Sequence, residues 1–200
     1  TMALVEEIML EPRWDEREFD LAKQSTLSQI AQQSANPNSI ASNTFNKLLY
    51  GDDHILSFNT IGTTNSVEAI TLDDLKTYYD ANFSPSVAKM HVVGSVSKDD
   101  VIASLTSIED SWASKPVDIP EFEFPEAPES STVYFYDVPD AKQSVLRFGY
   151  LAMPETDPYF YPATIMNYKL GGGGFASRLT QQLREGKGYT YGIRSGFSGS

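Results

Sequence analysis

Apolar side chains recur at helical spacing through the first 112 residues. The first helical face carries Leu4, Val5, Ile8 and Met9 and ends before Pro12. The same spacing predicts helices over residues 15–33, 39–50, 71–79 and 97–112, with Asp15, Ser39, Thr71 and Ser97 as their N-caps. Residues 52–70 are polar with mixed spacing and are predicted to form a loop.

Alternating apolar and aromatic positions predict short strands, most of them in the second half of the chain. These strands cover residues 90–93, 132–137, 143–150 and 189–193. A further helix is predicted from Asp157 as N-cap to Leu170, and another from Phe175 to Leu183, ended by Gly186 and Gly188. Helices and strands together predict an α+β fold.

A segment rich in proline and acidic residues separates two parts of the chain. Residues 115–130 contain four prolines and five acidic side chains, a composition that cannot sustain a helix and is typical of an extended linker. The predicted organisation is therefore one α+β part over residues 1–114, a linker over 115–130, and a second part over 131–200.

Composition narrows the functional classes. The net charge is −12, so we expect no nucleic-acid partner and no binding to anionic membrane surfaces. Cysteine is absent, which excludes disulfides, a thiol nucleophile and a thiolate zinc site. No apolar run approaches the roughly 18 residues of a membrane-spanning helix. These features fit either a bacterial periplasm or a cytoplasm, so the compartment is left open.

The most informative stretch runs from Leu170 to Ile193. A run of four glycines, Gly171 to Gly174, precedes Ser177-Arg178-Leu179, then Leu183-Arg184-Glu185, a Lys187-Gly188 turn and Tyr191. This order resembles the pitrilysin/insulinase family of zinc metallopeptidases, which includes the mitochondrial processing peptidases, in the half that does not bind zinc. The segments Asn82-Phe83-Ser84-Pro85 and Val92-Val93-Gly94 also match the family, although each is a weak signature alone.

The resemblance implies a fold and a division of labour. It implies a processing-peptidase-like α+β domain, with helices packed on one face of an antiparallel or mixed sheet. We therefore expect this chain to be a piece of a longer subunit that spans parts of two such domains. In the family, an arginine and a tyrosine at this spacing contact the substrate backbone, and that role falls here on Arg184 and Tyr191. The implied partners are a peptide substrate and a zinc-binding half, on the same polypeptide or a separate subunit.

The residues of a zinc centre are missing from the sequence. The family's inverted motif places two histidines and a glutamate on one helical turn. The chain has only His54 and His91, far apart and without the required neighbours. The family's third ligand corresponds to a position near Gln29, and a neutral amide is a poor zinc ligand. We expect no metal and no catalytic residue in this chain, with zinc in the partner half.

Alternative interpretations apply to the same residues. Spacing alone also allows Arg184 to pair with Glu185 while Tyr191 packs in a core. The chain could instead be a structural core subunit of a larger complex, or part of an active zinc peptidase whose metal motif lies elsewhere. Residues 171–176 satisfy the loose dinucleotide pattern, but they follow a predicted helix rather than a strand, which disfavours nucleotide binding. Finally, unpaired strand edges are expected to favour self-association.

Overall fold

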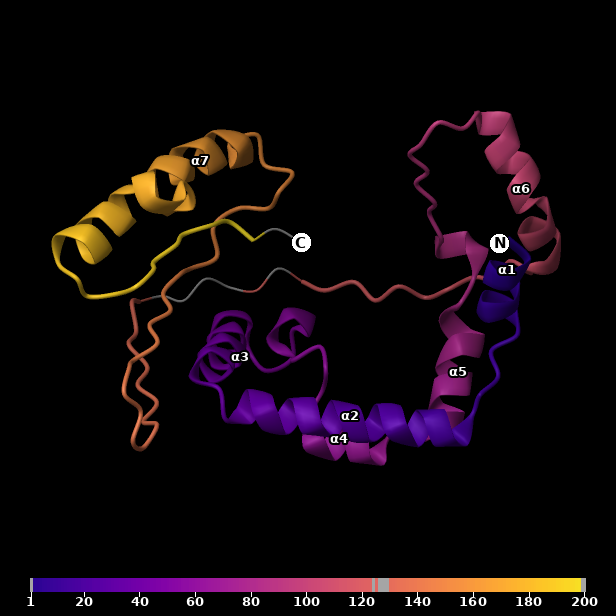
Figure 1. The fold of residues 1–200 in the computed structure, drawn as a ribbon, viewed down its shortest axis with the longest axis horizontal. Coiled ribbons are helices and arrows are strands. Elements are labelled where there is room, and N and C mark those ends of the chain that lie inside the picture. Colours follow the sequence, from indigo (N-terminus) through magenta and orange to yellow (C-terminus); the bar gives the residue numbers. More distant parts are fainter. Residues whose placement is uncertain (1, 124, 126–129, 199–200) are drawn as a thin grey trace. The chain divides into compact units, whose positions relative to one another are not determined.

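The protein is largely helical and divides into two units. The computed structural model describes residues 2–123, 125 and 130–198. The units are Thr1–Phe148 and Gly149–Ser200, and helices occur in both (Figure 1). Positions 124 and 126–129 of the predicted linker, and Gly199 and Ser200, lie outside the described residues. None of the described helices is long and apolar enough to span a membrane.

Apart from α4, the α-helices of the first unit lie close to the predicted positions. Their bounds are α1 Met2–Leu10, α2 Glu16–Ser34, α3 Pro37–Tyr50, α4 Thr64–Ala69, α5 Leu72–Asn82 and α6 Lys98–Ser111. Asp15 caps α2 by accepting a hydrogen bond from the Glu18 amide at 3.0 Å. Thr71 caps α5 in a reciprocal pair with Asp74, as the sequence predicted.

Two predictions about helix starts in this unit are wrong. The N-cap of α3 is Asn36 rather than Ser39, because Pro37 takes the first helical position and the Asn36 side chain accepts the next two amides. The predicted loop over residues 52–70 contains α4, which begins at a capping box formed by Thr63 and Ser66. The usual capping box has Glu or Gln at the third position, and this one has Ser66 instead.

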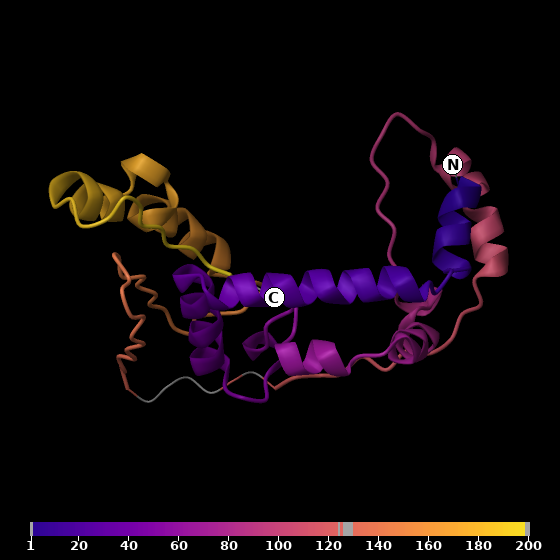
Figure 2. The same cartoon turned by 60° about the horizontal axis from the view of Figure 1, so that its bottom comes forward.

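Helices α2 and α4 pack side by side (Figures 1 and 2). Ile30 of α2 and Val67 of α4 are both buried. The Lys23 ammonium donates to the carbonyls of Glu68 and Ile70 at 2.7 and 2.8 Å, which satisfies acceptors that the end of α4 leaves free. This contact anchors the short α4 on the long α2.

A ladder of aromatic rings connects α5 to the neighbouring segments. Tyr79 meets Trp14 edge to face at 5.4 Å between ring centres and stacks on Phe83 at 4.8 Å. Phe83 in turn stacks on Trp112 at the end of α6, at 4.7 Å. The Tyr79 hydroxyl donates to the Met9 carbonyl of α1. Burial, followed by the negative charge of Asp80, raises the pKa of Tyr79 above its ordinary value.

The predicted α+β fold is wrong for the part of the chain that the structure describes. Residues 2–123, 125 and 130–198 contain no strand and therefore no sheet. The four predicted strand segments are irregular, with bends at Gln143 and Tyr191, and no backbone hydrogen bond joins one of them to another. Their side chains are correspondingly open, with Val93 99% and Phe135 89% exposed. Local alternation of apolar and polar residues favours extended backbone, but a β-sheet also requires a neighbouring strand that forms backbone hydrogen bonds with it.

Candidate substrate-binding site

The site predicted from the sequence lies in the second unit, on helical segments joined by the glycine run. Helix α7 spans Phe160–Asn167 and continues as a π-helical turn over Tyr168–Gly172. Asp157 does not cap α7, which begins three residues later, but its carboxylate accepts the Tyr159 amide at 2.8 Å. The predicted helix from Asp157 to Leu170 is therefore shorter at its start and changes form near its end.

The glycine run interrupts the helix between two helical segments. The Gly173 amide donates to the Tyr168 carbonyl at 2.8 Å, and a β-carbon at Gly173 would lie 2.7 Å from that oxygen. Gly174 has φ +61°, a backbone conformation that other residues adopt only with strain. After this turn the chain is helical again from residue 178 to Gly186, in π-helical form over Thr180–Gly186. We call this segment the Arg184 helix.

Small polar residues, rather than large apolar ones, hold the Arg184 helix in place. Ser177 is completely buried, and its hydroxyl donates to the Thr180 hydroxyl at 3.0 Å. The Thr180 hydroxyl reaches the Ile193 carbonyl at 3.4 Å. On α7, the Asn167 amide donates to the Ser195 carbonyl at 2.9 Å and accepts from the Ser195 hydroxyl at 2.6 Å. These bonds fix the extended segment that carries Tyr191 against both helices.

Arg184 sits near the end of its helix and its side chain is only partly exposed, at 33%. One guanidinium nitrogen lies 3.5 Å from the Glu185 carboxylate. The guanidinium carbon lies 4.5 Å from the centre of the Phe175 ring, a cation–π distance. The ion pair with Glu185, which the spacing alone allowed, is thus present. The ring of Phe175 is a second restraint on Arg184, and sequence spacing did not predict it.

Tyr191 lies beyond the turn that ends the Arg184 helix. Gly188 has φ +64°, and its amide donates to the Arg184 carbonyl at 3.0 Å, which closes the helix as the sequence predicted. The Tyr191 side chain is 88% exposed, so it does not pack in a core. No hydrogen bond or ring contact among the described residues joins Tyr191 to Arg184. The two donors are held on either side of one turn with the phenol open to solvent.

The residues present do not fit a zinc ion. Among the described residues no three His, Cys, Asp or Glu side chains come together in a group that could hold a metal. His54 uses its Nδ1 atom to accept the Leu56 amide and stacks against Tyr50, while His91 is exposed on an extended segment. The Gln29 amide contacts only Ser25, within its own helix. No step of metal chemistry can be assigned to this part of the protein.

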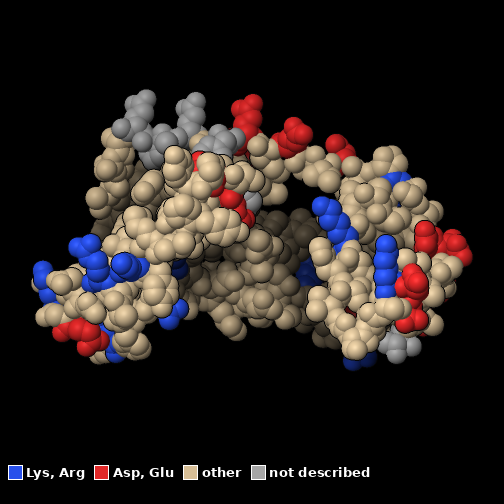
Figure 3. Space-filling view, turned by 90° about the horizontal axis from the view of Figure 1, so that it is seen from above, with Lys and Arg blue, Asp and Glu red and all other residues tan. Residues whose placement is uncertain are grey.

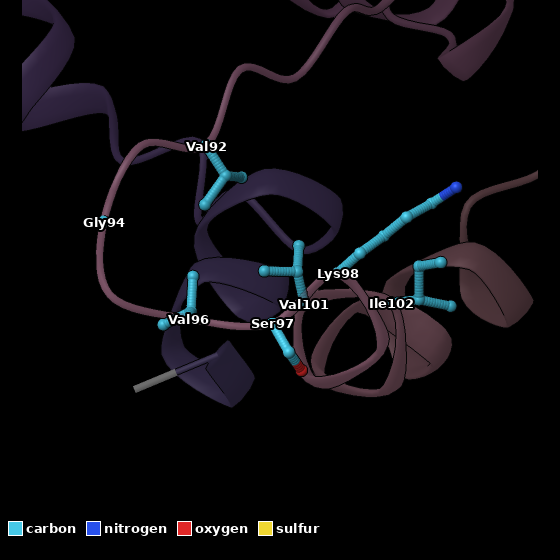
Figure 4. Close-up of a pocket in the computed structure, with 7 residues that line it drawn as sticks. All are labelled: Val92, Gly94, Val96, Ser97, Lys98, Val101 and Ile102. Atoms are coloured by element: carbon cyan, nitrogen blue, oxygen red, sulfur yellow. The ribbon is translucent and has the colours of Figure 1, made fainter.

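A shallow hollow at the start of α6 offers no chemistry either (Figure 4). It is lined mainly by valine and isoleucine side chains, together with Gly94, Ser97 and Lys98. The Lys98 ammonium points away from it, and the Ser97 hydroxyl is engaged with Asp100 at 2.6 Å. This leaves the Arg184 helix and its turn as the candidate site.

Comparison with known proteins places residues 69–200 in the sequence family described as "Peptidase M16 inactive domain". A protein named uncharacterized zinc protease from Mycobacterium leprae is 25% identical over 199 residues, covering 96% of this chain and 43% of that protein. A Bacillus subtilis protein of the same description is 25% identical over 185 residues, covering 91% and 43%. The chain therefore spans less than half the length of these relatives.

Two further similarities bear on activity and fold. A protein named non-peptidase homolog from Helicobacter pylori is 24% identical over 198 residues, covering 97% of this chain and 44% of that protein. The crystal structure of a peptidase M16 inactive domain from Pseudomonas fluorescens is 25% identical, with a TM-score of 0.80 over 99% of this chain and 47% of that one. Similar chains thus carry both peptidase and non-peptidase names.

Proposed function

We propose that this chain, which belongs to the M16 peptidase family, acts as the substrate-binding, non-catalytic half of a zinc-dependent peptidase. The family match confirms the resemblance to pitrilysin and insulinase inferred from the Arg184 and Tyr191 motif. The matched domain is the one described as inactive. In this proposal Arg184 and Tyr191 bind the backbone of a peptide whose bond is cut elsewhere.

The observation that carries the proposal is that the Arg184 guanidinium is restrained and the Tyr191 hydroxyl is exposed. The guanidinium of Arg184 contacts both the Phe175 ring and the Glu185 carboxylate, and it remains partly open to solvent. The Tyr191 hydroxyl is exposed on the next segment. A guanidinium and a phenol both donate hydrogen bonds, and peptide carbonyls accept them. A restrained guanidinium loses less conformational entropy on binding than a free one.

These donors would contribute to catalysis without performing it. Donors aimed at a carbonyl oxygen that gains negative charge contribute about 3–4 kcal/mol to transition-state stabilisation in other hydrolases. The water that attacks the carbonyl would be activated by zinc in the partner half, which lowers the pKa of a bound water. The chain covers less than half the length of its relatives, so a zinc-binding half could lie on the same polypeptide. A separate subunit is the other possible arrangement.

A second candidate is a structural role without peptidase activity. The Helicobacter pylori relative carries the name non-peptidase homolog, which favours this possibility for some chains of similar sequence. The two functions differ in what Arg184 does. Replacing Arg184 by alanine in the full-length protein should lower peptide hydrolysis without loss of zinc under the first proposal. A full-length protein that cleaves no peptide would support the structural role.

A further inference from the structure

The charges of the protein are divided unequally between the two units. Residues 149–200 carry five basic side chains, at Lys169, Arg178, Arg184, Lys187 and Arg194, and three acidic ones. The other 148 residues carry ten basic and 24 acidic side chains. The unit with the candidate site is therefore positive, by two charges, in a protein whose net charge is −12.

Within this unit four of the five basic side chains lie on the Arg184 helix, in the turn after it, or on the segment that follows. From residue 158 to 198 the only acidic side chain is Glu185, and it is already paired with Arg184. Arg178 is exposed at the start of the Arg184 helix, Lys187 is exposed in the turn, and Arg194 is exposed three residues after Tyr191. In the space-filling view, the lobe at the lower left shows several Lys and Arg side chains and fewer acidic ones (Figure 3).

From this distribution, and resting on the peptide-binding function proposed above, we propose that the site selects peptides with acidic side chains beside the bound backbone. Arg178, Lys187 and Arg194 would face carboxylates of the substrate while Arg184 and Tyr191 hold its backbone. The ion pairs recorded among the described residues involve Lys47, Lys76 and Arg184, so none of these three cations is engaged in one. All three side chains are exposed, and the Lys187 ammonium also lies 5.5 Å from the centre of the Tyr189 ring.

Salt screening limits the distance over which the charges of the protein act on a ligand. Charges farther apart than about 8 Å are largely screened at physiological ionic strength. The basic side chains of the second unit therefore act mainly on ligand charges within about 8 Å of them. A field of one sign at a binding site raises the local concentration and association rate of oppositely charged ligands by about tenfold or more.

A short acidic peptide fits this distribution better than a nucleic acid. A nucleic acid carries one negative charge per nucleotide, and neutralising several phosphates needs a larger excess of cations than the two net positive charges of residues 149–200. A peptide with a few carboxylates places its charge only where the cations lie. The rings of Tyr189 and Phe175 are largely exposed, and the parts of them that Lys187 and Arg184 leave open supply apolar contact surface for its side chains.

The test uses the full-length zinc-containing protein and three internally quenched peptides of equal length. They share one cleavable core and carry four glutamates, four serines or four lysines. The expected kcat/KM is about tenfold higher for the glutamate peptide than for the lysine peptide at low salt, with the ratio shrinking as salt rises. Equal kcat/KM for these two peptides would overturn the proposal, as would a ratio that does not depend on salt.

Matched variants locate the preference. Arg178→Gln, Lys187→Gln and Arg194→Gln combined should abolish it. Lys89→Gln, Lys98→Gln and Lys142→Gln combined change the net charge equally, at exposed positions in the other unit, and should preserve it. A preference that survives the first set, or disappears with the second, would overturn the assignment to this site.

Two further outcomes separate this inference from the function on which it rests. If hydrolysis of the serine peptide falls in Arg184→Ala while the glutamate and lysine peptides remain equal, only the acidic preference is wrong. If Arg184→Ala leaves the serine peptide unaffected, or no peptide is cleaved, the binding function is wrong as well. Stronger inhibition by a single-stranded oligonucleotide than by an uncleavable glutamate peptide of equal charge would favour a nucleic-acid ligand and overturn the proposal.

Discussion

The guanidinium carbon of Arg184 lies 4.5 Å from the centre of the Phe175 ring. Phe175 follows the glycine run directly, and its ring is 72% exposed, so it contributes little to a core. Its main recorded partner is the cation nine residues later. The glycine turn therefore brings an aromatic ring to the residue expected to bind substrate, and this ring restrains Arg184 in addition to Glu185.

Phe175 is expected to act as a positioning residue for Arg184. A cation–π contact at an exposed site is worth about 0.5–1 kcal/mol, which corresponds to a roughly two- to fivefold loss. Phe175→Leu should lower kcat/KM of the full-length protein by that factor, with zinc content unchanged, and Phe175→Tyr should restore it. Tyr159→Leu removes another exposed ring and serves as the control. Equal losses in the leucine and tyrosine variants at residue 175 would rule out this role.

Gly171 is expected to tolerate no side chain. A β-carbon there would lie 2.2 Å from the Ser195 hydroxyl and 2.7 Å from the Ser195 amide nitrogen. Because the amide belongs to the backbone, relief requires the segment after Tyr191 to shift, and such overpacking costs about 1–3 kcal/mol. Gly171→Ala should therefore lower the free energy of unfolding in urea by that amount.

Gly192→Ala provides the matched control for Gly171. A β-carbon at Gly192 has no atom within 4 Å, and its backbone is not in the left-handed region. We expect its unfolding midpoint to stay close to that of the wild type. An alanine at 171 that unfolds at the same urea concentration as the control would show that Ser195 does not pack against this turn.

The carboxylate of Glu6 makes the stability of the first unit depend on pH. Hydrogen bonds from the Ser107 and Ser111 hydroxyls, at 2.6 and 2.9 Å, hold the pKa of Glu6 below its ordinary value. A group with a lowered folded pKa binds fewer protons in the folded state, so its contribution is present above the unfolded value of 4.5 and is lost as the pH falls below it. Glu6→Gln should therefore flatten the decline in thermal stability on acidification.

The control for Glu6 is Glu7→Gln, which removes an exposed carboxylate from the same helix. The Glu6 side chain forms hydrogen bonds from α1 to α6. Glu6→Gln should therefore lower the stability only above the acidic range, where the Glu6 carboxylate of the wild type is ionised. Parallel pH profiles for wild type and Glu6→Gln would contradict the role of these hydroxyl bonds.

The sequence predicted best those features that depend on a few neighbouring residues. Asp15 and the Thr71 and Asp74 pair were identified as helix starts because capping is a local exchange of hydrogen bonds. The strands were wrong because pairing depends on distant segments, which local alternation does not contain. The Arg184 helix was predicted, but its π-helical form and its contact with Phe175 follow from how the glycine turn closes.

The extended segments also bear on association, and we propose that the chain self-associates through them. Residues 131–150 expose Val133, Phe135 and Leu146 almost fully, together with backbone groups that no neighbouring segment pairs. Size-exclusion chromatography with light scattering should show dimers or larger species at micromolar concentration. Phe135→Lys with Leu146→Lys should shift the distribution to monomer. A monomer at all concentrations in the unmodified chain would exclude this behaviour.

The central claim concerns what Arg184 and Tyr191 do in the full-length protein. The most direct measurement is kcat/KM for a neutral peptide in Arg184→Ala and Tyr191→Phe, with zinc content determined by elemental analysis in the same preparations. The account predicts a fall of about tenfold or more for Arg184→Ala and a smaller fall for Tyr191→Phe, with zinc retained in both. Unchanged turnover in both variants at full zinc content would contradict it.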